Sequence, residues 1–303
     1  RMRIGLITQL HGRPGGDTPP PTWSSIRERA LLAEDIGFDM FVYEDVLMYR
    51  GDEATDGVWE SVAISAAVAE ATSTLRFGQS VINSPYRSPA MTVSIAETLN
   101  EISGGRYVLG IGAGNSPTSD YEGFGFPTDR RYSRFAEAIE IIHSLARTGS
   151  VDFQGDFYSA KQGEIVLRGP SDLWINIAAG GPKMLDLAAQ YADAWNWWAW
   201  GETIEQSSAR LLPILERLNE ACVTQGRDPD SLERTLDVYS IIAPGLEADA
   251  GMEDPIQGSA AEIASAIGAL GNLGIDEVRC DVFPKTPAGI EAMAPVVAMV
   301  HDL

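Results

Sequence analysis

Short apolar runs alternate with longer segments of helical periodicity along the whole chain. Runs bounded by Gly, Pro and Asp are typical of buried parallel strands, and the periodic segments between them predict amphipathic helices. The expected strands are 3–8, 38–43, 75–81, 106–111, 173–177, a short one centred on Ala194, 236–242 and 277–283. The expected helices are 23–36, 58–71, 89–102, 129–146, a segment ending near Tyr191, 204–225, 259–273 and 287–301.

This alternation predicts an α/β protein with the (β/α)₈ architecture of a TIM barrel, because eight strand–helix units follow one another without a linker. We therefore expect one domain over residues 1–303. Insertions are expected after the fourth strand, after the seventh strand and before the fifth. Binding sites of such barrels lie at the carboxyl ends of the strands.

The stretch 75–115 is the most informative part of the pattern. It predicts a strand, a crossover helix and a second strand that ends in glycines at 110, 112 and 114. Glycines at a strand end allow close approach of the backbone to another group. The spacing is not the Gly-x-Gly-x-x-Gly fingerprint of dinucleotide binding, because Asn115 stands where a fingerprint that begins at Gly110 requires its third glycine.

Composition narrows the class of partner. A formal net charge of −21 argues against nucleic acid, which needs a basic surface, and against an anionic membrane. The net charge does not determine the local charge at a site, so it is compatible with an anionic cofactor. No apolar run is long enough to span a bilayer. The two cysteines, Cys222 and Cys280, are far apart in sequence, and we expect them to be buried free thiols in a reducing cytoplasm.

Several short segments, in this order and spacing, resemble the bacterial-luciferase-like superfamily of flavin and deazaflavin oxidoreductases. They are 33–39, 74–81, 86–90, 97–106, 109–115, 124–127 with Arg130, 155–158, 180–185 and 191–196. The resemblance implies an oxidoreductase that uses either FMN, as a monooxygenase, or coenzyme F420, for hydride transfer. The residues leave the choice between the two cofactors open.

The resemblance also implies where the cofactor lies. Ala179, Gly180 and Gly181 precede a helix that begins with Pro182, and free N–H groups at such a helix start suit a phosphate. Backbone of Gly112, Gly114 and Asn115 would run along the cofactor's side chain. Ser80-Val81 lies where relatives often carry a cis peptide beneath the ring, and Asn83 would bond the ring's pyrimidine edge.

Acid–base chemistry is the point at which the chain departs from its relatives. Many of them have Asp-His at the end of the second strand, whereas this chain has Glu44-Asp45. Asp45 is a candidate base or hydrogen-bond acceptor, with Glu44 beside it. His11, after the first strand, is the histidine best placed to substitute, while His143 and His301 are expected to be structural or solvent-facing.

Tryptophans follow the sixth strand. Trp197, Trp198 and Trp200 are candidate walls of an apolar substrate pocket, and Trp195 is expected to pack in the core. Expected partners are a small organic substrate, a separate flavin reductase for the FMN version and a second copy of the chain. Two other readings stay open: a barrel that binds a flavin without turnover, and a metal-dependent lyase, although no metal-ligand spacing is present.

Overall fold

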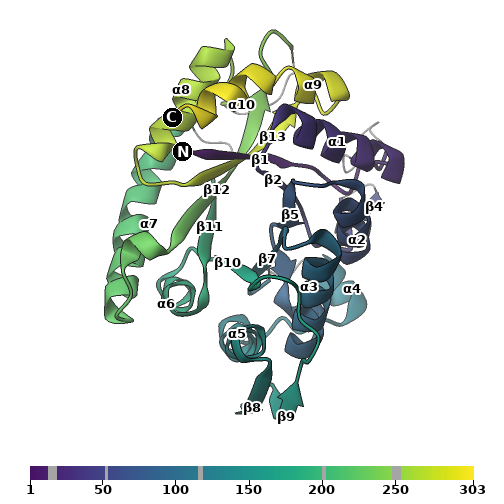
Figure 1. Ribbon diagram of the computed structural model, residues 1–303, viewed down its shortest axis with the longest axis vertical. Coiled ribbons are helices and arrows are strands. Elements are labelled where there is room, and N and C mark those ends of the chain that lie inside the picture. The colour runs from purple at the N-terminus through teal and green to yellow at the C-terminus, as the bar shows by residue number, and fades with distance from the viewer. Residues whose placement is uncertain (13–18, 52–53, 115–118, 200–202, 248–253) are drawn as a thin grey trace.

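The computed structural model describes residues 1–12, 19–51, 54–114, 119–199, 203–247 and 254–303. The predicted strands form a closed parallel barrel surrounded by helices (Figure 1). The barrel strands are β1 (Arg3–Ile7), β2 (Met40–Tyr43), β5 (Arg76–Gln79), β7 (Tyr107–Gly112), β10 (Trp174–Ala178), β11 (Ala194–Ala199), β12 (Glu233–Ile242) and β13 (Glu277–Phe283). Each pairs with the next, and β1 with β13 and β7 with β10 complete the ring. The predicted TIM barrel is confirmed.

The helices that cover the barrel begin and end at residues suited to those positions. They are α1 (Trp23–Ile36), α2 (Ser61–Ala71), α3 (Pro89–Ser103), α5 (Arg131–Thr148), α6 (Pro182–Tyr191), α7 (Ile204–Thr224), α8 (Ala260–Gly271), α9 (Pro287–Glu291) and α10 (Ala294–His301). Thr203 and Ser259 form capping boxes, in which the cap and the third helical residue satisfy each other's backbone N–H groups. Gly37 ends α1 in the left-handed conformation that glycine adopts without strain.

Some elements differ from the sequence expectation. The second helix begins at Ser61 because Glu60 caps it, and part of the segment before it forms the antiparallel hairpin of β3 (Met48–Arg50) and β4 (Thr55–Gly57). A second hairpin, β8 (Ser150–Gln154) with β9 (Ser159–Glu164), lies in the insertion before β10. The last predicted helix is divided into α9 and α10, and Pro295 lies in the first turn of α10. Short segments α4 (Ser119–Phe124), β6 (Ile82–Asn83), η1 (Ser84–Tyr86) and η2 (Pro229–Ser231) complete the described elements.

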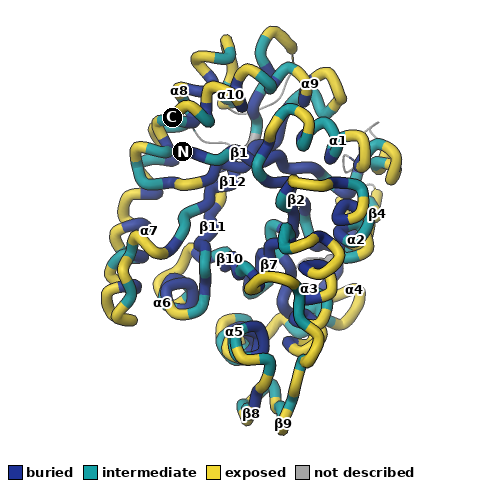
Figure 2. Tube along the Cα trace, viewed as in Figure 1, coloured by how far each residue is buried: buried dark blue, intermediate teal, exposed yellow. Residues whose placement is uncertain are grey.

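Burial follows the two layers of the fold (Figure 2). An extensive apolar core lies between the barrel and its helices, and it includes both cysteines, which are free and buried. In contrast, the inner face of the barrel carries buried polar side chains, among them Asn196, Asp237 and Arg279. Gly5 makes room for Arg279, because a Cβ there would lie 3.0 Å from Cγ of Arg279. In the described residues, no helix has both the length and the apolar character that a membrane crossing requires.

Candidate active site

Three adjacent strands present small side chains at their carboxyl ends. The peptide bond between Ser80 and Val81 is cis, which confirms the expectation at the end of β5. A Cβ on Gly112 would lie 2.9 Å from Cγ2 of Val81 and 3.7 Å from Cβ of Ala178. Val81, Gly112 and Ala178 therefore form one continuous surface across β5, β7 and β10, which we call the shelf.

The structure requires a glycine at position 114, but for a different reason from the one that the sequence suggests. Its φ of +88° favours glycine, and a Cβ there would overlap the Tyr121 hydroxyl and lie 3.3 Å from Pro85. The close approach at this glycine is thus an approach to protein atoms. Arg131 fixes the same residue by donating to the Gly114 carbonyl over 3.1 Å. The predicted neighbour Asn115 lies outside the described residues.

The turn between β10 and α6 exposes two glycines. Gly181 is the N-cap residue of α6 and makes no side-chain cap, so the helix start is not covered by a hydroxyl or carboxylate of its own cap. Ala179 differs, since its N–H donates to Asn196 O over 3.1 Å and its carbonyl accepts from the Trp195 indole over 2.7 Å. Of the three predicted phosphate-site residues, Gly180 and Gly181 are exposed and Ala179 is buried.

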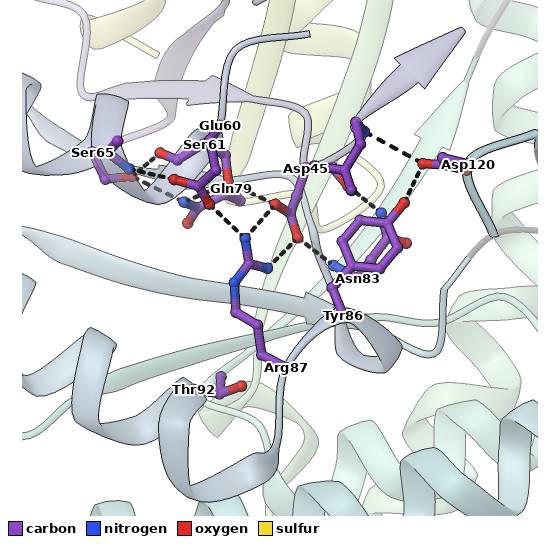
Figure 3. A network of polar contacts seen from close by, with 12 residues as sticks. Asp45, Glu60, Ser61, Ser65, Gln79, Asn83, Tyr86, Arg87, Thr92 and Asp120 are labelled. Carbon is purple, nitrogen blue, oxygen red and sulfur yellow. Dashed lines mark hydrogen bonds and ion pairs between the residues drawn. The ribbon is translucent and has the colours of Figure 1, made fainter. Parts of the chain in front are cut away.

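Asp45 lies at the centre of a hydrogen-bond network (Figure 3). Its carboxylate accepts two bonds from Arg87, at 2.7 and 3.0 Å, one from the Ser61 hydroxyl at 2.7 Å and one from the Asn83 N–H at 2.9 Å. The side chain is 2% exposed. Burial alone would lower the pKa of Arg87, but its bonds to Asp45 and Glu60 outweigh burial and raise it. Both Asp45 oxygens are thereby occupied by donors.

Asn83 extends this network toward α4. Its amide nitrogen donates to the Asp45 carbonyl, and its amide oxygen accepts from the Tyr121 hydroxyl over 3.1 Å. Tyr86 donates to Asp120, which is fully buried and also accepts from the Leu47 N–H over 3.3 Å. The Asn83 amide is therefore engaged by protein groups on both sides. The network ties the loops after β2, β5 and β7 to one another.

His11 and Glu44 meet at the same rim. Nδ1 of His11 lies 2.6 Å from Oε1 of Glu44, and the Leu10 N–H donates to that oxygen over 2.9 Å. The imidazole packs against the Tyr49 ring with centroids 4.5 Å apart. Burial raises the pKa of Tyr49, with further contributions from the charges of Glu44 and Asp120. The structure thus joins two of the three predicted acid–base residues and pairs the third, Asp45, with Arg87.

The tryptophans of β11 divide between two environments. Trp195 is fully buried, as expected, and Trp197 is only 3% exposed, with the Arg210 guanidinium 4.7 Å from its ring centroid. Trp198 shares the inner face with Asn196, because alternate residues of a strand face the same side, and it is 43% exposed. Of the predicted pocket walls, Trp198 is the exposed one; Trp200 lies outside the described residues.

A charged cluster inside the barrel was not anticipated from the sequence. The Ser80 hydroxyl donates to Asp237 over 2.7 Å, and Asn196 donates to the other Asp237 oxygen over 3.1 Å. Arg279 lies 3.7 Å from Asp237 and bonds Glu277 over 2.6 Å. A signal was present, since Glu277, Arg279 and Asp281 alternate with apolar residues along one strand. Arg87 lies in the segment 86–90 that resembles the family, but no role was predicted for it.

The described residues contain no group of three or more His, Cys, Asp or Glu placed to hold a metal ion. The metal-dependent reading therefore has no ligand set in this part of the chain.

Comparison with known proteins gives a family model and several relatives. The model described as luciferase-like monooxygenase matches residues 2–272. A 5,10-methylenetetrahydromethanopterin reductase of Archaeoglobus fulgidus is 38% identical over 162 residues, which cover 54% of this chain and 45% of the relative. An F420-dependent glucose-6-phosphate dehydrogenase of Amycolatopsis mediterranei is 29% identical over 214 residues, covering 70% of this chain and 63% of the relative.

The match thus spans less than two thirds of either relative's own length. Among solved structures, an F420-dependent secondary alcohol dehydrogenase in complex with an F420-acetone adduct superposes with a TM-score of 0.80 at 17% identity, covering 99% of both chains. At that identity the likeness concerns the fold.

Proposed function

Because the chain belongs to the luciferase-like monooxygenase family, we propose that it is an oxidoreductase that binds coenzyme F420 at the carboxyl rim of its barrel and transfers a hydride to or from a small organic substrate. The cofactor choice is supported by the relative that is named as F420-dependent. The observation that carries the site is the juxtaposition, on the adjacent strands β7 and β10, of the shelf and the open helix start at Gly181.

The residues present suit such a cofactor. The shelf consists of small apolar residues, which suits an apolar ring face, and the α6 start offers backbone N–H groups and a positive dipole end to a phosphate. Lys183 adds a positive charge in the first turn of α6. A bound deazaflavin or flavin would supply the hydride or oxygen chemistry, which the side chains at this rim lack.

The chain's own residues would orient and shield the ring. Asp45 would act through Arg87 and Asn83 by holding the loop after β5 in place. Tyr86, Asp120 and Tyr121 would fix α4 beside the shelf and limit entry of water. Trp198, which is 43% exposed, would contribute an apolar wall for the substrate.

Cofactor titration tests this proposal directly. Purified protein is mixed with coenzyme F420 and, separately, with FMN, and binding is followed by fluorescence. We expect saturable binding of F420 that is tighter than that of FMN. Failure of both to bind at millimolar concentration would refute the site.

A matched pair of variants tests the phosphate position. Gly181 has a φ of −90°, and no atom lies within 4 Å of a Cβ built there, so side chains are accommodated. Gly181→Asp places a negative charge at the helix start, while Gly181→Asn has nearly the same shape without the charge. We expect Asp to weaken cofactor binding by about tenfold relative to Asn, equivalent to about 1.4 kcal/mol. Equal affinities of the two variants would place the phosphate elsewhere.

The family name favours a second candidate, a monooxygenase that uses reduced FMN. It predicts tighter binding of FMN, together with oxygen consumption when a separate reductase supplies the reduced flavin. A homodimer and a cytoplasmic location belong to both versions and are tested by light scattering and by cell fractionation. Cofactor binding without turnover on any alcohol, carbonyl or alkane substrate would support the binding-only barrel.

A further inference from the structure

We propose that His11 and Glu44 form the acid–base pair of this site, with Nε2 of His11 as the atom that takes or gives the substrate's proton. The inference rests on the proposed function. It assigns proton transfer to the ends of β1 and β2 together, whereas the sequence left open whether Asp45 or His11 takes this role.

The two side chains are fixed to each other by the fold. β1 and β2 are neighbouring parallel strands, so the residues that follow them emerge side by side at the rim. Oε1 of Glu44 accepts both from Nδ1 of His11, at 2.6 Å, and from the N–H of Leu10, at 2.9 Å. The carboxylate therefore holds the imidazole and the backbone that carries it, and it keeps the proton of a neutral His11 on Nδ1.

The other ring nitrogen is left available. Nε2 of His11 has no hydrogen-bond partner among the described residues. It is also not one of the polar side-chain atoms that are both buried and without a partner. It is therefore reached by solvent, although the side chain as a whole is only 11% exposed. Packing against Tyr49 restricts rotation of the ring.

Asp45 and the other two histidines are each engaged by protein groups or remote from the rim. Asp45 has both oxygens bonded to donors, including a bidentate Arg87. His143 of α5 packs against Tyr191 of α6 in the helical layer. His301 pairs with Asp39 over 2.8 Å, and Asp39 accepts from the N–H of Ile4 near the amino end of β1, opposite the catalytic rim. Of the chain's three histidines, His11 alone lies at the carboxyl ends of the strands.

The pair accepts the proton that is released when a carbinol is oxidised to a carbonyl compound. The O–H bond of the substrate breaks and its proton goes to Nε2 of His11, while the electrons of that bond form the second bond of the carbonyl. The C–H bond breaks with its electron pair, and the hydride goes to the oxidised deazaflavin or flavin of the proposed function. In the reverse direction, the imidazolium returns the proton to the carbonyl oxygen. Glu44 stabilises the imidazolium in both directions.

The geometry is tested first without substrate or cofactor. Diethylpyrocarbonate modifies an accessible, unprotonated imidazole nitrogen, and peptide mass spectrometry identifies the histidine. We expect His11 to react faster than His301, whose Nε2 is bonded to Asp39. An unreactive His11 would contradict the open Nε2 and overturn the assignment.

Catalysis is then tested with the intact protein, coenzyme F420 and a panel of secondary alcohols and ketones. We expect His11→Asn to lower kcat by about 100-fold or more, the range of general acid–base catalysis, with the KM for substrate and the Kd for cofactor unchanged. Added imidazole should restore part of the lost rate. Glu44→Gln should cost about 10-fold, as supporting groups do, and His143→Asn is the control with wild-type activity.

The outcomes separate this inference from the function beneath it. A His11→Asn variant as active as the wild type overturns the pair and leaves the oxidoreductase standing. A lowered rate that imidazole does not restore, together with weaker cofactor binding, assigns His11 a structural role and also overturns the pair. A wild-type protein that turns over no substrate with either cofactor overturns the proposed function itself.

Discussion

At the scale of single residues, Asp45 is a carboxylate whose two oxygens are both occupied by protein donors. It is nearly inaccessible, and its four donors come from the backbone of Asn83, the hydroxyl of Ser61 and the guanidinium of Arg87. A buried ion pair of this kind does not guarantee stability, yet removal of one partner leaves the other charge uncompensated.

Arg87→Met should therefore destabilise the protein by about 3–5 kcal/mol, because Asp45 would stay buried without its counter-ion. Urea denaturation at neutral pH measures the change. Arg217→Met is the matched control, since Arg217 forms an ion pair of 2.6 Å with Asp186 on the surface and its loss should cost about 0–1 kcal/mol. Similar losses for both variants would mean that Asp45 is hydrated in solution.

Gly114 permits a second prediction at this scale. Gly114→Ala combines a left-handed backbone, worth about 1–3 kcal/mol, with overlap of the new methyl group and the Tyr121 hydroxyl. Gly226→Ala carries the backbone cost alone, because its φ is +70° and nothing lies within 4 Å of the added Cβ. We expect thermal unfolding to show a larger loss for Gly114→Ala. Equal losses would indicate that α4 moves away freely.

At the scale of elements, one carboxylate links a helix end to the strand that follows the next helix. Glu34, near the end of α1, accepts from the N–H groups of Ser73, Thr74 and Leu75 at 2.5 to 3.0 Å, just before β5. Burial would raise the pKa of Glu34, but the backbone donors outweigh it and lower the pKa below the usual 4.5. The same contacts position β5, whose end carries Ser80 and Val81.

Glu34→Gln should consequently lose stability in a pH-dependent manner. A carboxyl group whose pKa is lower in the folded state stabilises that state above its unfolded pKa, and the stabilisation disappears as the pH falls through the folded pKa. Wild type should exceed Glu34→Gln at pH 7, and the gap should close below about pH 4. Denaturation at several pH values measures it; Asp35→Asn, an exposed neighbour, should show no such gap, and a gap of constant size would contradict the role of charge.

The elements differ in how far the sequence could predict them. The barrel was predictable because buried parallel strands are apolar throughout and their helices are periodic. The β3–β4 hairpin was not, because strands as short as Met48–Arg50 and Thr55–Gly57 hold too few residues to show alternation. Gly112 and Gly114 lie at the carboxyl end of β7 as predicted, yet the sequence could not show that Tyr121 fills the space beside Gly114. Likewise, nothing local to Asp45 announces its pairing with Arg87, which is distant in sequence.

At the scale of the whole molecule, ion pairs and hydrogen bonds connect opposite sides of the barrel through its interior. Arg279 and Glu277 lie on β13, Asp237 on β12 and Ser80 after β5, so one connected group of bonds crosses from one side of the ring to the other. Arg3 of β1 joins through Glu277 over 3.1 Å and through Glu233. Burial would lower the pKa of Arg279, but Glu277 and Asp237 outweigh it and raise the pKa, while burial raises that of Asp237.

The interior charges should therefore behave as one unit. Arg279→Met leaves Glu277 and Asp237 buried with less compensation and should cost about 3–5 kcal/mol. Asp237→Asn alone removes a partner of Arg279 and Ser80 and should also destabilise. The double variant removes one charge of each sign, so its loss should fall short of the sum of the singles by at least about 1 kcal/mol.

Arg1→Met is the control, because its 3.5 Å contact with Asp39 is exposed and should contribute little. Guanidinium denaturation of the wild type, the two single variants and the double variant gives the coupling energy, and strict additivity would show that water, rather than Arg279, balances Asp237. Because Ser80 bonds Asp237 directly, a measured coupling would also mean that the inner face of the barrel supports the residue next to the shelf.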